Sequence, residues 1–127
     1  MSNNILFAKS YNAGGAINAN SIVKAGANDY DVLQADGATA AAKLLGITME
    51  VAAASGERVD VVHCGVADVK LGGTVARGDP ITSDASGNGV AAAPGAGTNN
   101  RIIGIALISG VSGDIIPVLV APSMLQG

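Results

Sequence analysis

The sequence has almost no aromatic side chains. Tryptophan is absent, and the 127 residues include one phenylalanine, Phe7, and two tyrosines, Tyr11 and Tyr30. Aromatic rings supply the stacking surface of many sugar and single-stranded nucleic-acid sites, so both kinds of ligand are disfavoured. The core must be built from Ala, Val, Ile and Leu, whose side chains bury less area than a ring does. A core of this kind predicts that oligomerisation adds stability.

Charged residues are also scarce. They make up 13% of the chain, against about 25% in a typical domain, and the formal net charge is −3. Because no basic patch stands out, the sequence argues against a nucleic-acid partner. A surface with few charges suits contact with other proteins.

Intrachain disulfide bonds and membrane-spanning segments are not expected either. The single Cys64 cannot form an intrachain disulfide. The first residues lack a basic stretch followed by an apolar run, so no secretory signal is predicted. The longest apolar runs, Ile102–Ile108 and Ile115–Ala121, are much shorter than the ~20 residues of a spanning helix, which argues against a membrane partner.

What the sequence does contain is short, glycine-bounded runs rich in Val and Ile, such as the alternating Val66–Leu71. They predict an all-β domain, either a β-sandwich or a barrel-like fold. A minor helix is expected only at Ala38–Leu45, where Ala and Lys favour it. Asp84–Gly89 is typical of a hairpin turn, with Asn88-Gly89 supplying the positive φ. Ala92–Asn100 is small, polar and glycine-rich, which predicts a surface loop.

The two halves of the sequence resemble each other. Gly14-Gly15 recurs as Gly72-Gly73, and the segment 43–47 recurs as 101–105, both 58 residues later. A shared spacing over this length predicts a duplication, with half-repeats at about 14–71 and 72–121 that pack about a pseudo-two-fold axis and share one core. We therefore expect a single β domain at 14–127, preceded by an N-terminal arm at 1–13.

One adjacent pair, His63-Cys64, could suggest nucleophilic catalysis or metal binding. Neighbouring residues on a strand point to opposite faces, however, and a catalytic base needs a third group to orient it. A zinc site would need further ligands. We expect a buried Cys64 and a His63 that is exposed or hydrogen-bonded.

Acidic residues suggest two further ion sites. Asp84 and the residues after it imitate the start of a calcium loop, but the acidic residue required at loop position 12 is replaced by Gly95. Asp29 and Asp31 flank Tyr30 and are expected on a solvated strand face. We predict no catalytic residue, no cofactor and no metal site, and hence a protein that is not an enzyme.

The N-terminal segment is the candidate contact site. Its polar start, Ser2–Asn4, is followed by the apolar residues 5–8. One interpretation is a frayed terminus that leads into the first strand. The other is an arm that lies on a neighbouring subunit by strand addition. The candidate capsid or subunit contacts are Asn3, Asn4, Ile5, Leu6 and Phe7.

Several motifs follow one another in a characteristic order. They are Leu45–Thr48, Gly56–Val61, Gly65–Ala67, Val69–Gly73, Gly78–Thr82, Asp84–Gly89 and Ile103–Ala106. Each alone is a β-turn pattern, but their order and spacing resemble the small capsid decoration, or cement, proteins of tailed bacteriophages. The resemblance covers roughly residues 30 to 121.

The resemblance implies a structural virion protein, made in the host cytoplasm, that binds the outer surface of the phage head. It implies stabilisation of the capsid by bridging subunits of the major capsid protein, often as a homotrimer, with no catalytic residues. Three alternatives stay open: another oligomeric virion component such as a tail or fibre protein, a non-catalytic surface-binding module, and an enzyme whose site forms between subunits.

Overall fold

The structure is a computed structural model that describes residues 4–37 and 42–127. These residues form strands and no helix, which confirms the all-β class and leaves no helix that could cross a membrane among them. The strands are β1 (Asn4–Ala13), β2 (Ile22–Ala25), β3 (Asp31–Gln34), β4 (Leu44–Thr48), β5 (Arg58–Lys70), β6 (Pro80–Ser83), β7 (Gly89–Ala91), β8 (Asn99–Ala106) and β9 (Ile115–Gln126).

The minor helix predicted at Ala38–Leu45 is wrong for its described part. Leu44 begins β4, where it pairs with Lys24 of β2 and is buried in the core. Burial and strand pairing outweigh the helix propensity of such a short stretch. Residues 38–41 lie outside the described residues.

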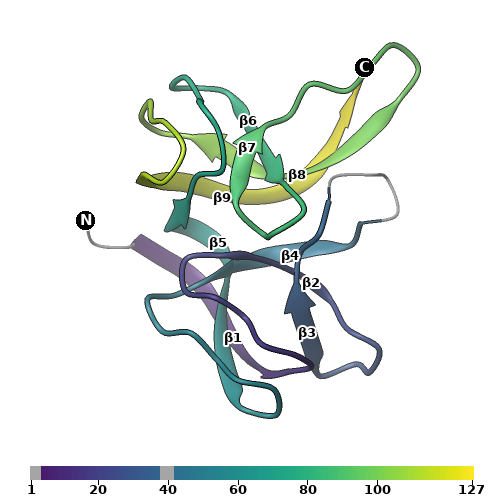
Figure 1. The fold of residues 1–127 in the computed structure, drawn as a ribbon, viewed down its shortest axis with the longest axis vertical. Helices are drawn as coiled ribbons and strands as arrows, with labels where there is room; N and C mark the ends of the chain where they lie inside the picture. Colours follow the sequence, from purple (N-terminus) through teal and green to yellow (C-terminus); the bar gives the residue numbers. More distant parts are fainter. Residues whose placement is uncertain (1–3, 38–41) are drawn as a thin grey trace.

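The strands close into two lobes that share β5, with β1 to β4 below and β6 to β9 above in Figure 1. The lower lobe has the order β1-β3-β2-β4-β5, and a pairing between β5 and β1 closes it. The upper lobe has the order β5-β9-β8-β6-β7, and a parallel bridge between Leu71 and Gly89 brings the end of β5 beside β7. This closed arrangement is barrel-like, as predicted.

The long strand β5 serves both lobes because it has 13 residues. Val61 and Val62 pair with β4 in the lower lobe, whereas residues 65–70 pair with β9 in the upper lobe. Val61 lies in the core of the lower lobe, and Val62 lies in the larger core that continues into the upper lobe. One strand therefore ties the two lobes into a single structure.

Both cores are aliphatic. The largest fully buried side chains are isoleucines, valines and one leucine, Leu71. Each contributes about 1.5–3 kcal/mol by leaving water. None of the three aromatic rings is among them, because Phe7 and Tyr30 are exposed and Tyr11 is half-buried at the edge of the lower core.

Backbone contacts recur at nearly the spacing on which the duplication was predicted, with 58 residues from Ile17 to Val75 and 57 from Ala53 to Gly110. Ile17 and Ala53 exchange two hydrogen bonds of 2.9 Å, and Val75 and Gly110 exchange two of 2.9 and 3.1 Å. In each lobe, the bridge joins the segment before the second strand to the loop before the last strand. These contacts support the half-repeats, which stay a prediction.

The predicted hairpin turn lies between β6 and β7. The Asp84 carboxylate accepts hydrogen bonds from the backbone N–H of Ser86 and of Asn88, at 2.8 and 3.0 Å. The positive φ, 78°, is at Gly87 rather than at Asn88-Gly89. Gly89 is not available for the turn because it already pairs with β6. The predicted surface loop follows β7 and ends where β8 begins.

Candidate binding surface

The N-terminal end of β1 carries exposed apolar side chains. Leu6 is 80% exposed, Phe7 55% and Ile5 41%. The pairing of β1 with β5 shifts register between Ile5 and Phe7 and again between Phe7 and Ala8. Such bulges leave a residue unpaired and re-aim its side chain, which explains why Leu6 stands away from the sheet. A group of large apolar side chains exposed together is typical of an interaction site.

The structure places most of the predicted arm in a paired strand. Asn3 lies outside the described residues, and Asn4 begins β1 opposite Val66 of β5. From Asn4 to Asn12 the strand pairs with β5 of the same chain, so the backbone of this segment is not a free arm. If Ile5, Leu6 and Phe7 contact a partner as predicted, they do so through side chains exposed on a paired strand.

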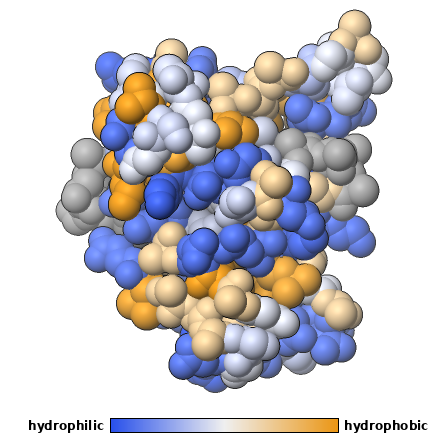
Figure 2. Space-filling model, viewed as in Figure 1, coloured by the Kyte–Doolittle hydropathy of each residue, from blue (hydrophilic) through white to orange (hydrophobic). Residues whose placement is uncertain are grey.

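An apolar row of side chains crosses the upper lobe. Val66 of β5 pairs with Leu119 of β9, which pairs in turn with Ile105 of β8. Directly paired residues share one face of a sheet. Leu119 is 43% exposed, and its two neighbours are half-buried. On the face shown in Figure 2, hydrophobic residues lie on both lobes, with a band of hydrophilic residues across the middle.

The three aromatic residues of the chain and its only histidine meet in the lower lobe. The ring of Phe7 stacks on His63 and that of Tyr11 meets it edge-on, both with centroids 5.5 Å apart. The ammonium of Lys9 lies 5.3 Å from the ring centroid of Tyr11 and 5.8 Å from that of Tyr30. We call these five residues the aromatic cluster. Phe7, Tyr30 and Lys9 remain exposed at its surface.

Hydrogen bonds fix the histidine of this cluster. The Nδ1 of His63 lies 3.0 Å from the carbonyl oxygen of Leu45, and its Nε2 lies 2.7 Å from the hydroxyl of Tyr11. A carbonyl only accepts, so Nδ1–H donates to Leu45 and, in the neutral ring, Nε2 accepts the Tyr11 O–H. His63 is therefore satisfied, as predicted, and holds β1 against β4 and β5.

The neighbouring thiol plays no part in this network. Cys64 pairs with Phe7 across the sheet and is exposed, so the expectation that it is buried is wrong. Val62 is buried in the core, whereas Cys64, on the other side of the register shift between Phe7 and Ala8, is exposed. His63 and Cys64 thus do not form a nucleophile and base.

The acidic residues considered as ion ligands have other roles. The carboxylate of Asp84 is held by the backbone of its own turn. Asp31 begins β3 and accepts a hydrogen bond of 2.9 Å from the amide of Asn28, while Asp29 lies in the preceding loop. Within the described part of the chain, no three His, Cys, Asp or Glu residues come together as metal ligands would.

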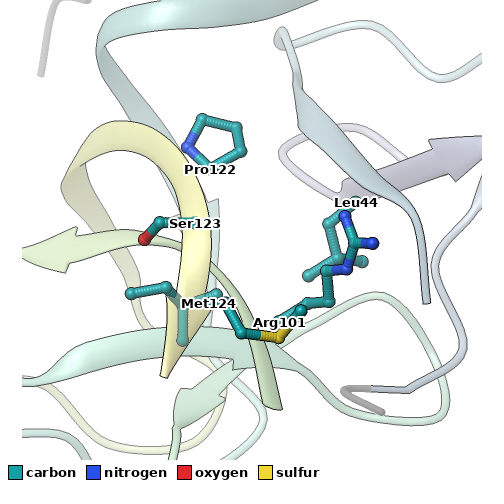
Figure 3. A pocket seen from close by; sticks show the side chains of 6 residues that line it. Leu44, Arg101, Pro122, Ser123 and Met124 are labelled. Atoms are coloured by element: carbon teal, nitrogen blue, oxygen red, sulfur yellow. The ribbon is translucent and has the colours of Figure 1, made fainter. Parts of the chain in front are cut away.

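The surface formed by the described residues includes two hollows of note. One, of about 260 Å³, lies where the β8–β9 ribbon approaches β4 and is lined by Leu44, Arg101, Ile102, Pro122, Ser123 and Met124. Figure 3 shows the side chain of Arg101 reaching toward Leu44. The other, of about 370 Å³, is lined by Met49, Val51, Arg58, Val59 and Asp60. Neither brings together the acid, base and nucleophile of a catalytic centre.

The family model of the phage cement proteins matches residues 7–120, so the chain belongs to the phage cement protein family. It is accordingly a structural protein of the phage virion that binds the capsid. Comparison with curated proteins gave no match.

A similar solved structure is the N base of the head fibre protein gp8.5 of bacteriophage phi29. The two structures superpose with a TM-score of 0.65 and 15% sequence identity, over 95% of this chain and 98% of the other. At that identity the likeness shows the fold.

The aromatic cluster is the feature that the sequence did not predict. Phe7 is one of the predicted contacts, but the sequence did not connect Lys9, Tyr11 and Tyr30 with it or with His63. The available signal was the spacing of residues 7, 9 and 11, which an alternating strand places on one face, in a chain with only three aromatic rings.

Proposed function

We propose that this protein binds the outer surface of the phage head, bridges subunits of the major capsid protein and so stabilises the capsid, without catalysing a reaction. The observation that carries the proposal is the group of exposed apolar side chains on β1, with Leu6 80% exposed, in a member of the cement family. Its place is the outside of the virion after synthesis in the host cytoplasm.

Bridging by many copies needs only modest contacts from each. Burying a leucine side chain contributes about 1.5–3 kcal/mol. Copies that also bind one another, as in the proposed homotrimer, add avidity because the second contact is intramolecular. The aliphatic cores and low charge suit a protein whose task is contact rather than chemistry.

The test is a substitution at the bulge. Because Leu6 is exposed, Leu6→Ser should leave folding unchanged but weaken binding to heads that lack the protein by about tenfold or more, the equivalent of the burial energy lost. Co-sedimentation with such heads measures the binding. The matched control is Val51→Ser, since Val51 is 76% exposed in the loop between β4 and β5 and is not part of the exposed apolar group on β1. Equal binding by both variants would remove Leu6 from the contact.

A second candidate is the base of a fibre on the head. The fold it shares with the head-fibre base of phage phi29 favours it. Electron microscopy of virions with and without the protein distinguishes the two. A lattice of compact densities that bridge capsomers supports the cement role, and isolated densities that continue into fibres support the second candidate.

A further inference from the structure

One edge of β1 has no strand beside it over most of its length. β3 meets β1 only at Asn12 and Ala13, and the other edge pairs with β5. None of the described strands covers the first edge between residues 4 and 11. The bulges disturb its first part, which leaves Ala8–Tyr11 as a regular and open edge. An open edge of this kind accepts an extended segment of another chain by strand addition.

The side chains along this edge differ from those at the matching place in the upper lobe. Lys9 and Tyr11 pair with buried valines of β5, so they share the inward face of the sheet. In the antiparallel pair of β5 with β9, Ala67 and Val69 pair with buried residues in the same way, and both are themselves fully buried. In the lower lobe, by contrast, Lys9 is exposed and Tyr11 is only half-buried. Departures of this kind from an otherwise consistent core mark functional positions.

Lys9 carries the charge of the aromatic cluster. Its ammonium lies over the rings of Tyr11 and Tyr30, at 5.3 and 5.8 Å, a favourable cation–π geometry. Among residues 4–37 and 42–127, no carboxylate lies within ion-pair distance of Lys9, and the ion pair of this region is Lys24 with Asp36. The cation is therefore positioned by rings and open to a carboxylate from outside the chain.

The aromatic cluster is also preorganised for binding a partner. His63 is hydrogen-bonded at both ring nitrogens and packs between Phe7 and Tyr11. Fixed aromatic side chains cost little conformational entropy when a partner binds them. The backbone of Tyr30 is itself tied to β1, because the N–H of Asn12 donates to its carbonyl at 2.8 Å.

From these observations we infer that β1 is a docking edge: an extended segment of the partner protein, carrying an aspartate or glutamate, adds to the open edge at Ala8–Tyr11 and places its carboxylate on Lys9, between Tyr11 and Tyr30. The inference rests on the proposed function, since the partner is the capsid. It adds the acidic character of the partner segment and names the residues that bind its carboxylate.

Lysine on an edge strand has another known role, which is to prevent unwanted pairing between sheets. The two roles predict different results for charge reversal. Lys9→Glu keeps a charge on the edge, so a purely protective lysine would leave partner binding unchanged. A lysine that pairs with a carboxylate would instead meet a like charge, which is unfavourable.

The experiment compares five proteins, the wild type and four variants, for binding to heads that lack the protein. Lys9→Glu should bind at least about tenfold more weakly than the wild type, Lys9→Gln should lose less, and Lys9→Arg should bind almost normally. The control is Lys70→Glu, the same change at an exposed lysine on β5 in the upper lobe. Circular dichroism and thermal unfolding confirm that each variant is folded, and Lys9→Gln serves if Lys9→Glu does not fold. Binding by the wild type, but not by Lys9→Glu, should weaken as salt is raised.

The outcomes separate the two proposals. If the wild type binds heads and Lys9→Glu binds as well as Lys70→Glu, or more tightly, the docking edge is refuted while the proposed function stands. If the wild type does not bind heads at all, both are refuted. A photo-crosslinking amino acid at Tyr30 supplies a second readout: a crosslinked capsid peptide containing Asp or Glu supports the inference, and one without an acidic residue contradicts it.

Discussion

Among the glycines of the described residues, Gly104 makes the closest backbone approach and is predicted to be the most sensitive to substitution. Gly104 of β8 lies against β9, and a Cβ added there would overlap the carbonyl oxygen of Leu119 and come within 2.8 Å of its carbonyl carbon. Both atoms belong to the backbone of a paired strand, so no side-chain rotation can relieve the overlap. Gly104→Ala therefore has to separate β8 from β9 where their register already shifts, between Ile102 and Gly104.

The cost follows from this separation. Overpacking a well-filled site costs about 1–3 kcal/mol, and each ladder hydrogen bond lost adds about 1 kcal/mol. We expect Gly104→Ala to lower the free energy of unfolding by about 3 kcal/mol. For a chain of this length, that corresponds to a fall in Tm of about 10 °C. Urea titration followed by circular dichroism measures the first quantity, and a thermal scan the second.

Two further glycines calibrate the experiment. A Cβ at Gly46 would overlap the carbonyl oxygen of Val62, so Gly46→Ala should cost a similar amount. Gly95 lies in the loop before β8, where a Cβ would meet only the Thr98 hydroxyl at 3.9 Å, and Gly95→Ala should change stability by less than about 0.5 kcal/mol. If Gly104→Ala proved as harmless as Gly95→Ala, the close approach of β8 and β9 would be wrong.

Two other predictions concern polar groups that pack against the sheet. Tyr11→Phe removes the hydroxyl that donates to His63 and should lower the free energy of unfolding by about 1 kcal/mol in urea titration; no loss would contradict that bond. Burial raises the pKa of the Asp68 carboxyl above its ordinary 3.8, and the Glu50 carboxylate adds to the rise. The folded state therefore binds this proton more tightly than the unfolded state, so the stabilising effect is complete below pH 3.8 and is lost as the pH rises through the raised pKa. Urea titrations across this range should show the wild type losing stability relative to Asp68→Asn, and a pH-independent difference would contradict the shift.

The strand content of this fold was predictable because the local signals agree. Glycine-bounded runs of Val and Ile, alternating as in Val66–Leu71, leave few alternatives to strands. The Asp84 turn was predictable for the same reason, since its aspartate accepts from its own backbone. The helix at Ala38–Leu45 failed because Leu44 is needed by the core, which depends on residues far away in the sequence.

Sequence patterns could not predict how the sheet closes into two lobes. Nothing local in β5 indicates that its first half belongs to one lobe and its second half to the other. The distribution follows from long-range pairings with β1, β4 and β9, which alternation alone does not specify. The same pairings turned the predicted arm into a strand, because the apolar side chains at its start also fit beside β5.

The aromatic cluster could not be predicted from the sequence for a related reason. His63 and Tyr30 reach Tyr11 and Lys9 through the pairing of β1 with β5 and with the loop before β3. Each residue alone has an ordinary interpretation as a strand or loop side chain. Only their convergence gives them a common role.

The difference between the two lobes shows how such a small chain can be both stable and adhesive. In the upper lobe, Ala67 and Val69 face a closed aliphatic core, which supplies stability through burial. In the lower lobe, Lys9 and Tyr11 pair with buried valines of β5 but are exposed and half-buried themselves, so that end of the lobe contributes less burial. Because β5 runs through both lobes, strand pairing in the upper lobe offsets the burial that is lost in the lower lobe. On this argument, replacing Lys9 by an aliphatic residue would favour the fold while weakening attachment to the head.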